Sequence, residues 1–273
     1  MVDGISRIQM HERSLGLTPK GKLIGQFTVS ILFTLVVVNV CHVAPTVQIP
    51  FLPVNDLGVL TTTLPIAGGI DIPWLYAVFC AILLAGMSNA VNLTDGLDGL
   101  ASGATAFVMG AYAALTFWQF RNSCAGTPQP GCYNVRDPLD LAVLAAAGLG
   151  ACIGFLWWNA APAKIFMGDT GSLTLGTIVS FFWLQSLSLP SEVITRLDVA
   201  PLALGAAPLL LPMFDTARLF FLRIYRRRSP FSADRHHIHH YLLDQGYSQG
   251  RTRLIILLSA VLLGVLHLVL LTT

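Results

Sequence analysis

The sequence predicts an all-α integral membrane protein, and composition, long apolar segments and the placement of basic residues all support this fold class. Of the 273 residues, 54% are hydrophobic and only 11% are Asp, Glu, Lys or Arg, and the mean hydropathy is +0.68. Soluble domains carry about 25% charged residues, so a polytopic membrane chain is expected. The net charge of +2 is too small to indicate nucleic-acid binding.

Seven segments are long and apolar enough to cross a bilayer, which takes about 17–25 mostly apolar residues. They are Leu23–Val43, Pro73–Ala90, Leu100–Phe117, Leu141–Trp158, Leu173–Leu189, Val199–Leu222 and Leu254–Leu271. No long soluble segment is left between them. The chain is therefore predicted to form a single polytopic membrane domain over residues 1–273.

Basic residues indicate the orientation, because cytoplasmic flanks of membrane spans carry an excess of Lys and Arg. Most of the 16 Lys and Arg residues lie in residues 7–22 and 218–253, so a cytoplasmic N-terminus places both stretches inside. Counting spans from there puts three polar clusters, residues 92–99, 159–172 and 223–253, on the same cytoplasmic face. A functional site on that face is the prediction that follows.

The opposite face receives the remaining connections, which are poor in basic residues. Val47–Ile72 alternates short β-branched runs with Pro and Gly, so a small outer β-hairpin is expected there. Cys124 and Cys132 share a later outer loop. An oxidising compartment would permit a disulfide between them, and two free thiols are the open alternative.

The first polar cluster places Asp95 and Asp98 at a membrane boundary, each followed by Gly and preceded by Asn89 and Asn92. Carboxylates at that depth are costly unless they are paired or functional. Asp and Gly also form tight turns, which would explain a single Asp-Gly step. Two such steps with two Asn side chains favour a ligand-binding loop.

The second cluster, residues 159–172, ends in Asp169, Thr170 and Ser172 before the fifth predicted span. All three are good helix N-caps, which is a sufficient structural explanation. The start of the helix would also favour an anion. The Asp-Thr-Gly-Ser string occurs in aspartic proteases, but those enzymes need a second such aspartate on a β-rich fold, so this reading is discarded.

The third cluster, residues 223–240, combines several arginines with His236, His237, His239 and His240. Juxtamembrane arginines are commonly topology signals or lipid contacts, but this does not explain the histidines. Clustered imidazoles suit metal binding or hydrogen bonds to phosphate and sugar oxygens. Zinc is disfavoured because cytoplasmic carboxylates suit Mg²⁺. Asp215 and Arg218 are expected to form an ion pair.

These clusters together supply carboxylates for a divalent cation and cationic or imidazole groups for anions, next to a membrane that could hold a lipid substrate. Phosphoryl transfer fits this set, because its catalysis consists mainly of positioning and charge neutralisation.

Three stretches carry a specific resemblance: N-A-V-N-L-T-D-G-L-D-G-L-A from Asn89, F-L-W-W-N-A-A-P-A-K-I-F-M-G-D-T-G-S from Phe155 and H-E-R-S-L-G-L-T-P-K-G-K-L-I-G-Q from His11. They resemble the phospho-N-acetylmuramoyl-pentapeptide transferases of the polyprenyl-phosphate N-acetylhexosamine-1-phosphate transferase superfamily. The resemblance runs to about Ser180, and the segment from Thr116 to Leu139 is similar to actinobacterial members.

The resemblance implies transfer of phospho-N-acetylmuramoyl-pentapeptide from UDP-MurNAc-pentapeptide to undecaprenyl phosphate, with release of uridine monophosphate (UMP). This is the first membrane step of peptidoglycan synthesis and of cell-wall biogenesis, at the bacterial plasma (inner) membrane with a cytoplasmic active site. Mg²⁺ is the implied cofactor, membrane lipid is an implied partner, nucleic acid is not, and a homodimer stays open.

The resemblance also implies roles for individual residues. Asp169 would bind Mg²⁺ and Phe166 would stack on uracil. The implied catalytic set is Asp3, Asp95, Asp98 and Asp169. The implied substrate-binding set is Asn92, Gly96, Leu97, Asn159, Phe166, His237, His239 and His240, in which Gly96 and Leu97, with Asp98, would line the uridine pocket.

The chain departs from the family pattern in two places. The family carries paired aspartates where this chain has Val2-Asp3-Gly4, so Asp3 is the candidate base, and the family has ten spans whereas this chain begins where the third ends. We therefore expect an N-terminally truncated or recombined member, for which an inactive membrane binding or partner protein is an alternative. Residues 211–218 and 229–240 are more similar to the polyprenyl-phosphate N-acetylglucosamine-1-phosphate transferases of teichoic acid and O-antigen synthesis, so UDP-GlcNAc is the alternative donor.

Overall fold

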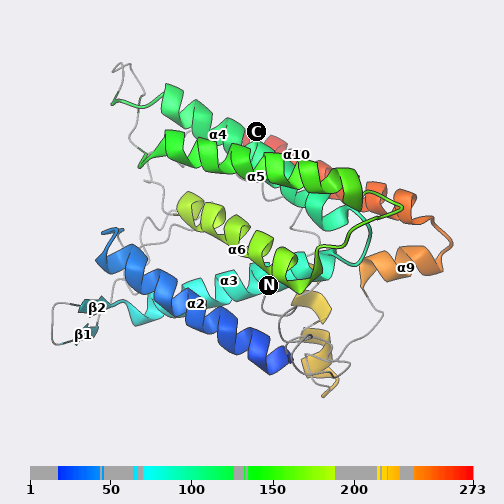
Figure 1. Cartoon of the computed structure of the whole chain (residues 1–273), viewed down its shortest axis with the longest axis horizontal. Coiled ribbons are helices and arrows are strands. Elements are labelled where there is room, and N and C mark those ends of the chain that lie inside the picture. The colour runs from blue at the N-terminus through cyan, green and yellow to red at the C-terminus, as the bar shows by residue number, and fades with distance from the viewer. Residues whose placement is uncertain are drawn as a thin grey trace. The chain divides into compact units, whose positions relative to one another are not determined.

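The computed structural model describes residues 18–43, 45, 64–66, 70–125, 132, 135–187, 214–215, 217–219, 221–227 and 237–272. These residues belong to two compact units. The first unit holds the described residues up to Asn89 together with residues 169–187. The second holds residues 90–168 and the described residues from 214 onward. Figure 1 labels the helices and strands of both units.

Four helices of the described part are long and apolar enough to cross a membrane. They are α2 (Pro19–Asn39), α3 (Trp74–Thr94), α4 (Leu100–Arg121) and α5 (Pro138–Asn159). They coincide with the first four predicted spans, so the prediction of a helical membrane protein is confirmed for this part of the chain.

Two further helices, α6 (Gly168–Leu187) and α10 (Gln249–Thr272), occupy the fifth and seventh predicted spans. A short helix, α9 (Ile238–Asp244), precedes α10. The predicted span Val199–Leu222 lies largely outside the described residues. The total of seven spans and their orientation therefore stay predictions.

Helix α2 is the first described element of the first unit, and its start follows from its sequence. Thr18 is the N-cap, and its hydroxyl accepts a hydrogen bond from the Gly21 N–H at 3.2 Å, while Pro19 takes the first helical position. Both residues are favoured there because the first N–H groups of a helix have no partner within it. Strands β1 (Leu64–Ile66) and β2 (Ile70–Ile72) pair antiparallel, within the segment expected to contain an outer hairpin.

Helices α3 and α6 approach each other closely in the first unit. A Cβ atom placed on Gly176 of α6 would lie 2.4 Å from the Ser88 Cα of α3, so only glycine fits at this crossing. The Ser88 hydroxyl donates to the Leu173 carbonyl at 3.1 Å. An apolar core of Tyr76, Cys80, Leu84 and Leu184 completes this packing.

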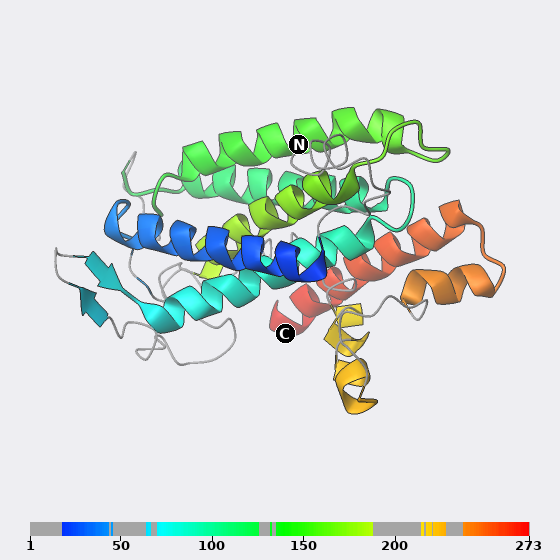
Figure 2. The same ribbon diagram turned by 60° about the horizontal axis from the view of Figure 1, so that its bottom comes forward.

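Helices α4 and α5 form the long pair of the second unit and run side by side in Figures 1 and 2. Gly148 of α5 packs against the Met109 side chain of α4, where an added Cβ would come within 3.1 Å of the sulfur. The outward side of α5 is apolar, with Val143, Leu144 and Ile153 exposed. Such a surface is expected where hydrocarbon replaces water.

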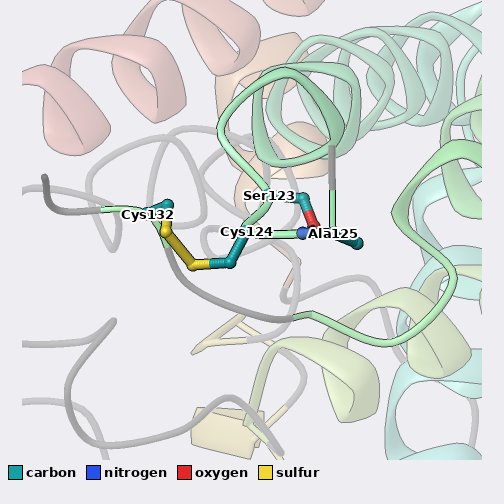
Figure 3. Close-up of a disulfide and its surroundings, with 4 residues drawn as sticks. All are labelled: Ser123, Cys124, Ala125 and Cys132. Atoms are coloured by element: carbon teal, nitrogen blue, oxygen red, sulfur yellow. Dashed lines mark hydrogen bonds between the residues drawn. A yellow bond between two sulfur atoms is a disulfide. The ribbon is translucent and has the colours of Figure 1, made fainter. Parts of the chain in front are cut away.

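The connection after α4 carries a disulfide between Cys124 and Cys132 (Figure 3). Of the two alternatives that the sequence left open, the structure therefore has the bonded one. Among the described residues, Cys41, Cys80 and Cys152 are not in a disulfide, and the last two are buried.

Candidate active site

The loop Asp95–Gly99 joins α3 to α4 and contains the first predicted cluster. The Asp95 N–H bonds the Val91 and Asn92 carbonyls at 3.2 and 3.3 Å, and the Leu100 N–H bonds the Leu97 carbonyl at 3.0 Å. Gly99 has φ +74°, a left-handed conformation that glycine adopts without steric cost. The second Asp-Gly step therefore has a clear conformational reason.

Asp98 ties this loop to the segment after α5 and to the start of α10. Its carboxylate accepts the Ala163 N–H at 3.1 Å, while its backbone carbonyl accepts a hydrogen bond from the Arg253 guanidinium. Arg253 also lies against Gly99, where an added Cβ would be 3.1 Å from its Nη1. Arg253 was predicted only as part of the basic stretch that indicates orientation, because nothing in its local pattern links it to a loop 155 residues earlier.

Asn159, at the end of α5, is buried and joins the first and second predicted clusters. Its amide oxygen accepts from the Gly99 N–H and from the Ser102 hydroxyl, each at 3.1 Å. Its amide nitrogen donates to the Ile165 carbonyl at 2.9 Å. A buried amide engaged in this way holds two loops in a fixed relation, since breaking its bonds would leave buried polar groups unsatisfied.

His239 lies directly against the Asp95–Gly99 loop. A Cβ atom on Gly96 would be 3.0 Å from the His239 Nε2, so glycine at this position makes room for the ring. The His239 ring stacks on that of His237, with centroids 5.7 Å apart, and contacts that of His240 at 4.3 Å. Residues of all three predicted clusters therefore meet within the second unit.

Burial lowers the pKa of His239 to about 4, and the neighbouring His240 and His237 add to this effect. His239 is therefore uncharged near neutral pH. The neutral ring can donate one hydrogen bond to a ligand and accept another, but it does not supply a positive charge.

Asp215 is a buried carboxylate of the second unit that was predicted only to form an ion pair. That pair exists, with the Arg218 Nη2 2.9 Å from the Asp215 Oδ1. In addition, the Asp215 Oδ2 lies 3.0 Å from the His237 Nδ1 and accepts the Ile238 N–H at 3.1 Å. An acidic residue upstream of a histidine cluster was the available signal, but sequence spacing does not show which ring it meets.

Asp169 lies in the first turn of α6 and forms an ion pair with Lys22 of α2 within the first unit. The side chains are 30% and 21% exposed, respectively. From the sequence, Lys22 was predicted only to mark the cytoplasmic side. Its contact with Asp169 depends on the packing of two helices that are distant in sequence.

Other predicted residues differ in their surroundings. Phe166 is 76% exposed, so its ring is accessible to a planar ligand. Leu97 is buried and packs with Leu100 and Ile256, so its side chain belongs to the core. Asn92 and Asp95 are partly buried. Asp3 lies outside the described residues, as does His236.

The described carboxylates suit a Mg²⁺ ion that is held by only one or two protein ligands. Within the described residues, no group of three or more His, Cys, Asp or Glu side chains lies close enough together to hold a metal ion. Mg²⁺ is often held by only one or two carboxylates, with waters and substrate phosphates completing its shell. Asp169 is a partly exposed carboxylate in the first turn of α6, so it could supply the single carboxylate that this mode of binding needs.

The fold and these side chains define a helical membrane protein with a polar site built from loops between its apolar helices. Residues 5–187 match the family described as glycosyl transferase family 4, and the chain belongs to this family. The resemblance inferred from the motifs is thereby confirmed.

The chain is similar to proteins named phospho-N-acetylmuramoyl-pentapeptide-transferase. The relative from Corynebacterium diphtheriae is 47% identical over 244 residues, covering 87% of this chain and 62% of the relative. The one from Corynebacterium kroppenstedtii is 56% identical over 172 residues, covering 62% and 46%. The one from Mycobacterium ulcerans is 48% identical over 198 residues, covering 71% and 50%. The chain thus spans about half to three-fifths of the length of these curated relatives.

Proposed function

We propose that this chain transfers phospho-N-acetylmuramoyl-pentapeptide from UDP-MurNAc-pentapeptide to undecaprenyl phosphate and releases UMP. The observation that carries this proposal is its similarity to relatives named for this transferase activity at 44–56% identity. The hydrogen bond between the Asp95–Gly99 loop and Asn159 adds support, because both come from the motifs that carry the resemblance.

In the proposed reaction, a phosphate oxygen of the prenyl phosphate attacks the phosphorus atom that bears the sugar. The bond between this phosphorus and the oxygen of UMP breaks, and UMP leaves. One phosphoanhydride is exchanged for another, so ATP is not required. Asp3 stays the candidate base for the attacking phosphate.

Asp169 is proposed to hold Mg²⁺, which when bound neutralises charge on the pyrophosphate of the donor. The carboxylate lies at a helix start and is partly exposed, so it can reach a ligand from solvent. The contact with Lys22 supplies a positive charge beside it, which would also attract phosphate oxygens.

The Asp95–Gly99 loop is proposed to bind the uridine, with Asn92 and Asp95 beside it and the exposed Phe166 ring available to stack on uracil. His237, His239 and His240 are proposed to contact the phosphate or sugar oxygens. His239 would do so as a neutral ring, since its pKa of about 4 keeps it uncharged at physiological pH.

The site is proposed to face the cytoplasm from the bacterial plasma membrane, because the basic flanks of the chain favour that orientation. A polyprenyl-phosphate N-acetylglucosamine-1-phosphate transferase is the second candidate. The pattern S-P-F-S-A-D-R-H-H-I-H-H favours it, and this segment lies beyond the part that matches the family.

The test uses membranes containing the chain, undecaprenyl phosphate, Mg²⁺ and one of the two labelled donors. Label in the lipid fraction from UDP-MurNAc-pentapeptide, with equimolar UMP, is the expected result. Label only from UDP-GlcNAc would favour the second candidate.

Asp169→Asn should abolish release of UMP. Asp140→Asn is the matched control, because Asp140 also lies in the first turn of a helix but is exposed on α5. Absence of UMP release with both donors would instead favour a binding or partner protein.

A further inference from the structure

Asp215 is 5% exposed, and among the described residues it meets the Arg218 guanidinium, the His237 ring and the Ile238 N–H. A buried charge is costly unless it is paired and its lone pairs are satisfied. Arg218 balances the charge, but an ion pair alone does not explain why the carboxylate also meets a histidine 22 residues away.

The chemistry of the contact fixes the state of the ring. An ionised carboxylate only accepts hydrogen bonds, so the His237 Nδ1, at 3.0 Å from the Asp215 Oδ2, has to carry the proton. A neutral His237 is then the Nδ1–H tautomer, and its Nε2 keeps a lone pair. The ring nitrogen that faces a ligand is commonly set by the hydrogen bond that the other nitrogen makes.

The same carboxylate also fixes the backbone beside this ring. The Ile238 N–H that it accepts belongs to the first residue of α9, for which His237 is the N-cap without a side-chain cap bond. Asp215 thus replaces the missing cap and holds the start of α9. The His237 ring stacks on His239, which lies against Gly96 of the uridine-binding loop proposed above.

We propose that Asp215 is a positioning residue that holds His237 as the Nδ1–H tautomer and leaves the Nε2 lone pair to accept a hydrogen bond from a hydroxyl group of the donor sugar. This inference rests on the proposed function of the site. The alternative is a purely structural carboxylate that anchors α9 and has no influence on the tautomer.

The first test reads the tautomer directly. The full chain, labelled with ¹⁵N-histidine and placed in lipid nanodiscs, is studied by NMR above the titration range of imidazole, and His237→Gln identifies the His237 signals among the seven histidines. The unmodified chain should show Nδ1–H at His237. Asp215→Asn should give a mixture with Nε2–H, because an amide can donate as well as accept. Asp244→Asn, the same change at the exposed end of α9, should leave the His237 signals unchanged. The same tautomer in the unmodified chain and in Asp215→Asn would overturn the proposal.

The second test asks whether Asp215 acts through His237 in turnover. Asp215→Asn should lower kcat/KM for the donor by about 10- to 100-fold, the usual effect of losing a group that orients a functional histidine. In a His237→Gln background the same change should lower kcat/KM by less than about twofold, because coupled residues are not additive. A full additional loss in that background would show that Asp215 acts independently of His237, and would refute the proposal.

Folding is controlled separately. If Asp215→Asn reduces the amount of folded protein, Asp215→Glu keeps a carboxylate that can only accept, and should restore the Nδ1–H tautomer and part of the activity. A folded Asp215→Glu protein that shows neither the Nδ1–H tautomer nor any recovered activity would count against the proposal. Absence of UMP release from the unmodified chain would overturn the proposed function alone. The tautomer of His237 is measured without turnover, so the NMR result would still decide the role of Asp215.

Discussion

Lys22 and Asp169, 147 residues apart in the chain, form an ion pair between the first turns of α2 and α6. If Asp169 holds Mg²⁺, the ammonium group and the metal ion compete for the same carboxylate. Partly exposed ion pairs contribute about 0.2–1 kcal/mol, so the competition is modest but measurable.

Replacement of Lys22 by Gln should therefore lower the Mg²⁺ concentration needed for half-maximal release of UMP by up to about fivefold, the ratio that corresponds to 1 kcal/mol. The measurement is a Mg²⁺ titration of the transferase reaction in membranes. Lys20→Gln is the matched control, because Lys20 is exposed in the same turn of α2. An unchanged Mg²⁺ requirement in Lys22→Gln would argue against Asp169 as the metal ligand.

Gly96→Ala should raise the KM for the nucleotide-sugar donor with little change in thermal stability. The backbone of Gly96 is not in the left-handed region, but the added Cβ would lie 3.0 Å from the His239 Nε2, so the ring has to move. Steady-state kinetics and a melting curve of the purified protein separate the two effects. Gly103→Ala on α4, where an added Cβ meets nothing within 4 Å, should leave the KM unchanged. A normal KM in Gly96→Ala would mean that the position of this ring is unimportant for donor binding.

Acid should destabilise the protein in part through His239. The pKa of His239 is lowered from its ordinary value of 6.5 to about 4, so the unfolded chain binds a proton at a higher pH than the folded chain. The stabilising contribution of the neutral ring is therefore complete above about pH 6.5 and is lost as the pH falls toward 4. The charged and titratable neighbours that enter this shift are His240, His237 and Asp215.

Melting temperatures measured across this pH range should consequently fall less steeply in His239→Gln than in the unmodified chain. His42→Gln is a suitable control, because His42 lies in the connection after α2. Parallel curves for His239→Gln and the unmodified chain would contradict the lowered pKa of this partly buried ring.

The disulfide between Cys124 and Cys132 allows a test of the proposed orientation. Disulfides persist in oxidising compartments, so the connection between α4 and α5 is expected to lie outside the cytoplasm. In intact cells carrying Cys41→Ser, a membrane-impermeant maleimide should label the chain only after treatment with an impermeant reductant. Cys124→Ser/Cys132→Ser should remove that label. Labelling that requires permeabilised cells would reverse the orientation and place the Asp95–Gly99 loop on the outer face.

The sequence predicted the helices well where apolar length decides the structure. Helices α2 to α5 coincide with four predicted spans, and their ends differ by a few residues for local reasons: α2 starts earlier because Thr18 caps it, and α3 continues to Thr94, whose hydroxyl bonds the Ala90 carbonyl. The polar motifs also identified the loops that meet in the second unit. Periodicity and charge were sufficient for these inferences.

The contact partners of individual side chains could not be predicted from the sequence. Arg253 was counted as a topology signal, yet it binds the Asp98 carbonyl, and the packing of the Leu97 side chain with Leu100 and Ile256 was not predicted. The contact between Asp215 and His237 depends on how two segments pack. Such contacts follow from tertiary structure, which spacing along one chain does not encode.

Asn159 binds Gly99, Ser102 and Ile165 through a single side chain, so it couples the two loops that it joins. A substitution in the Asp95–Gly99 loop will disturb residues 160–165, and the reverse holds as well, so the effects of changes in the two motifs will not be independent. Among related sequences, residues 95–99 and 160–165 are therefore expected to vary together, because both have to fit the same amide side chain at position 159.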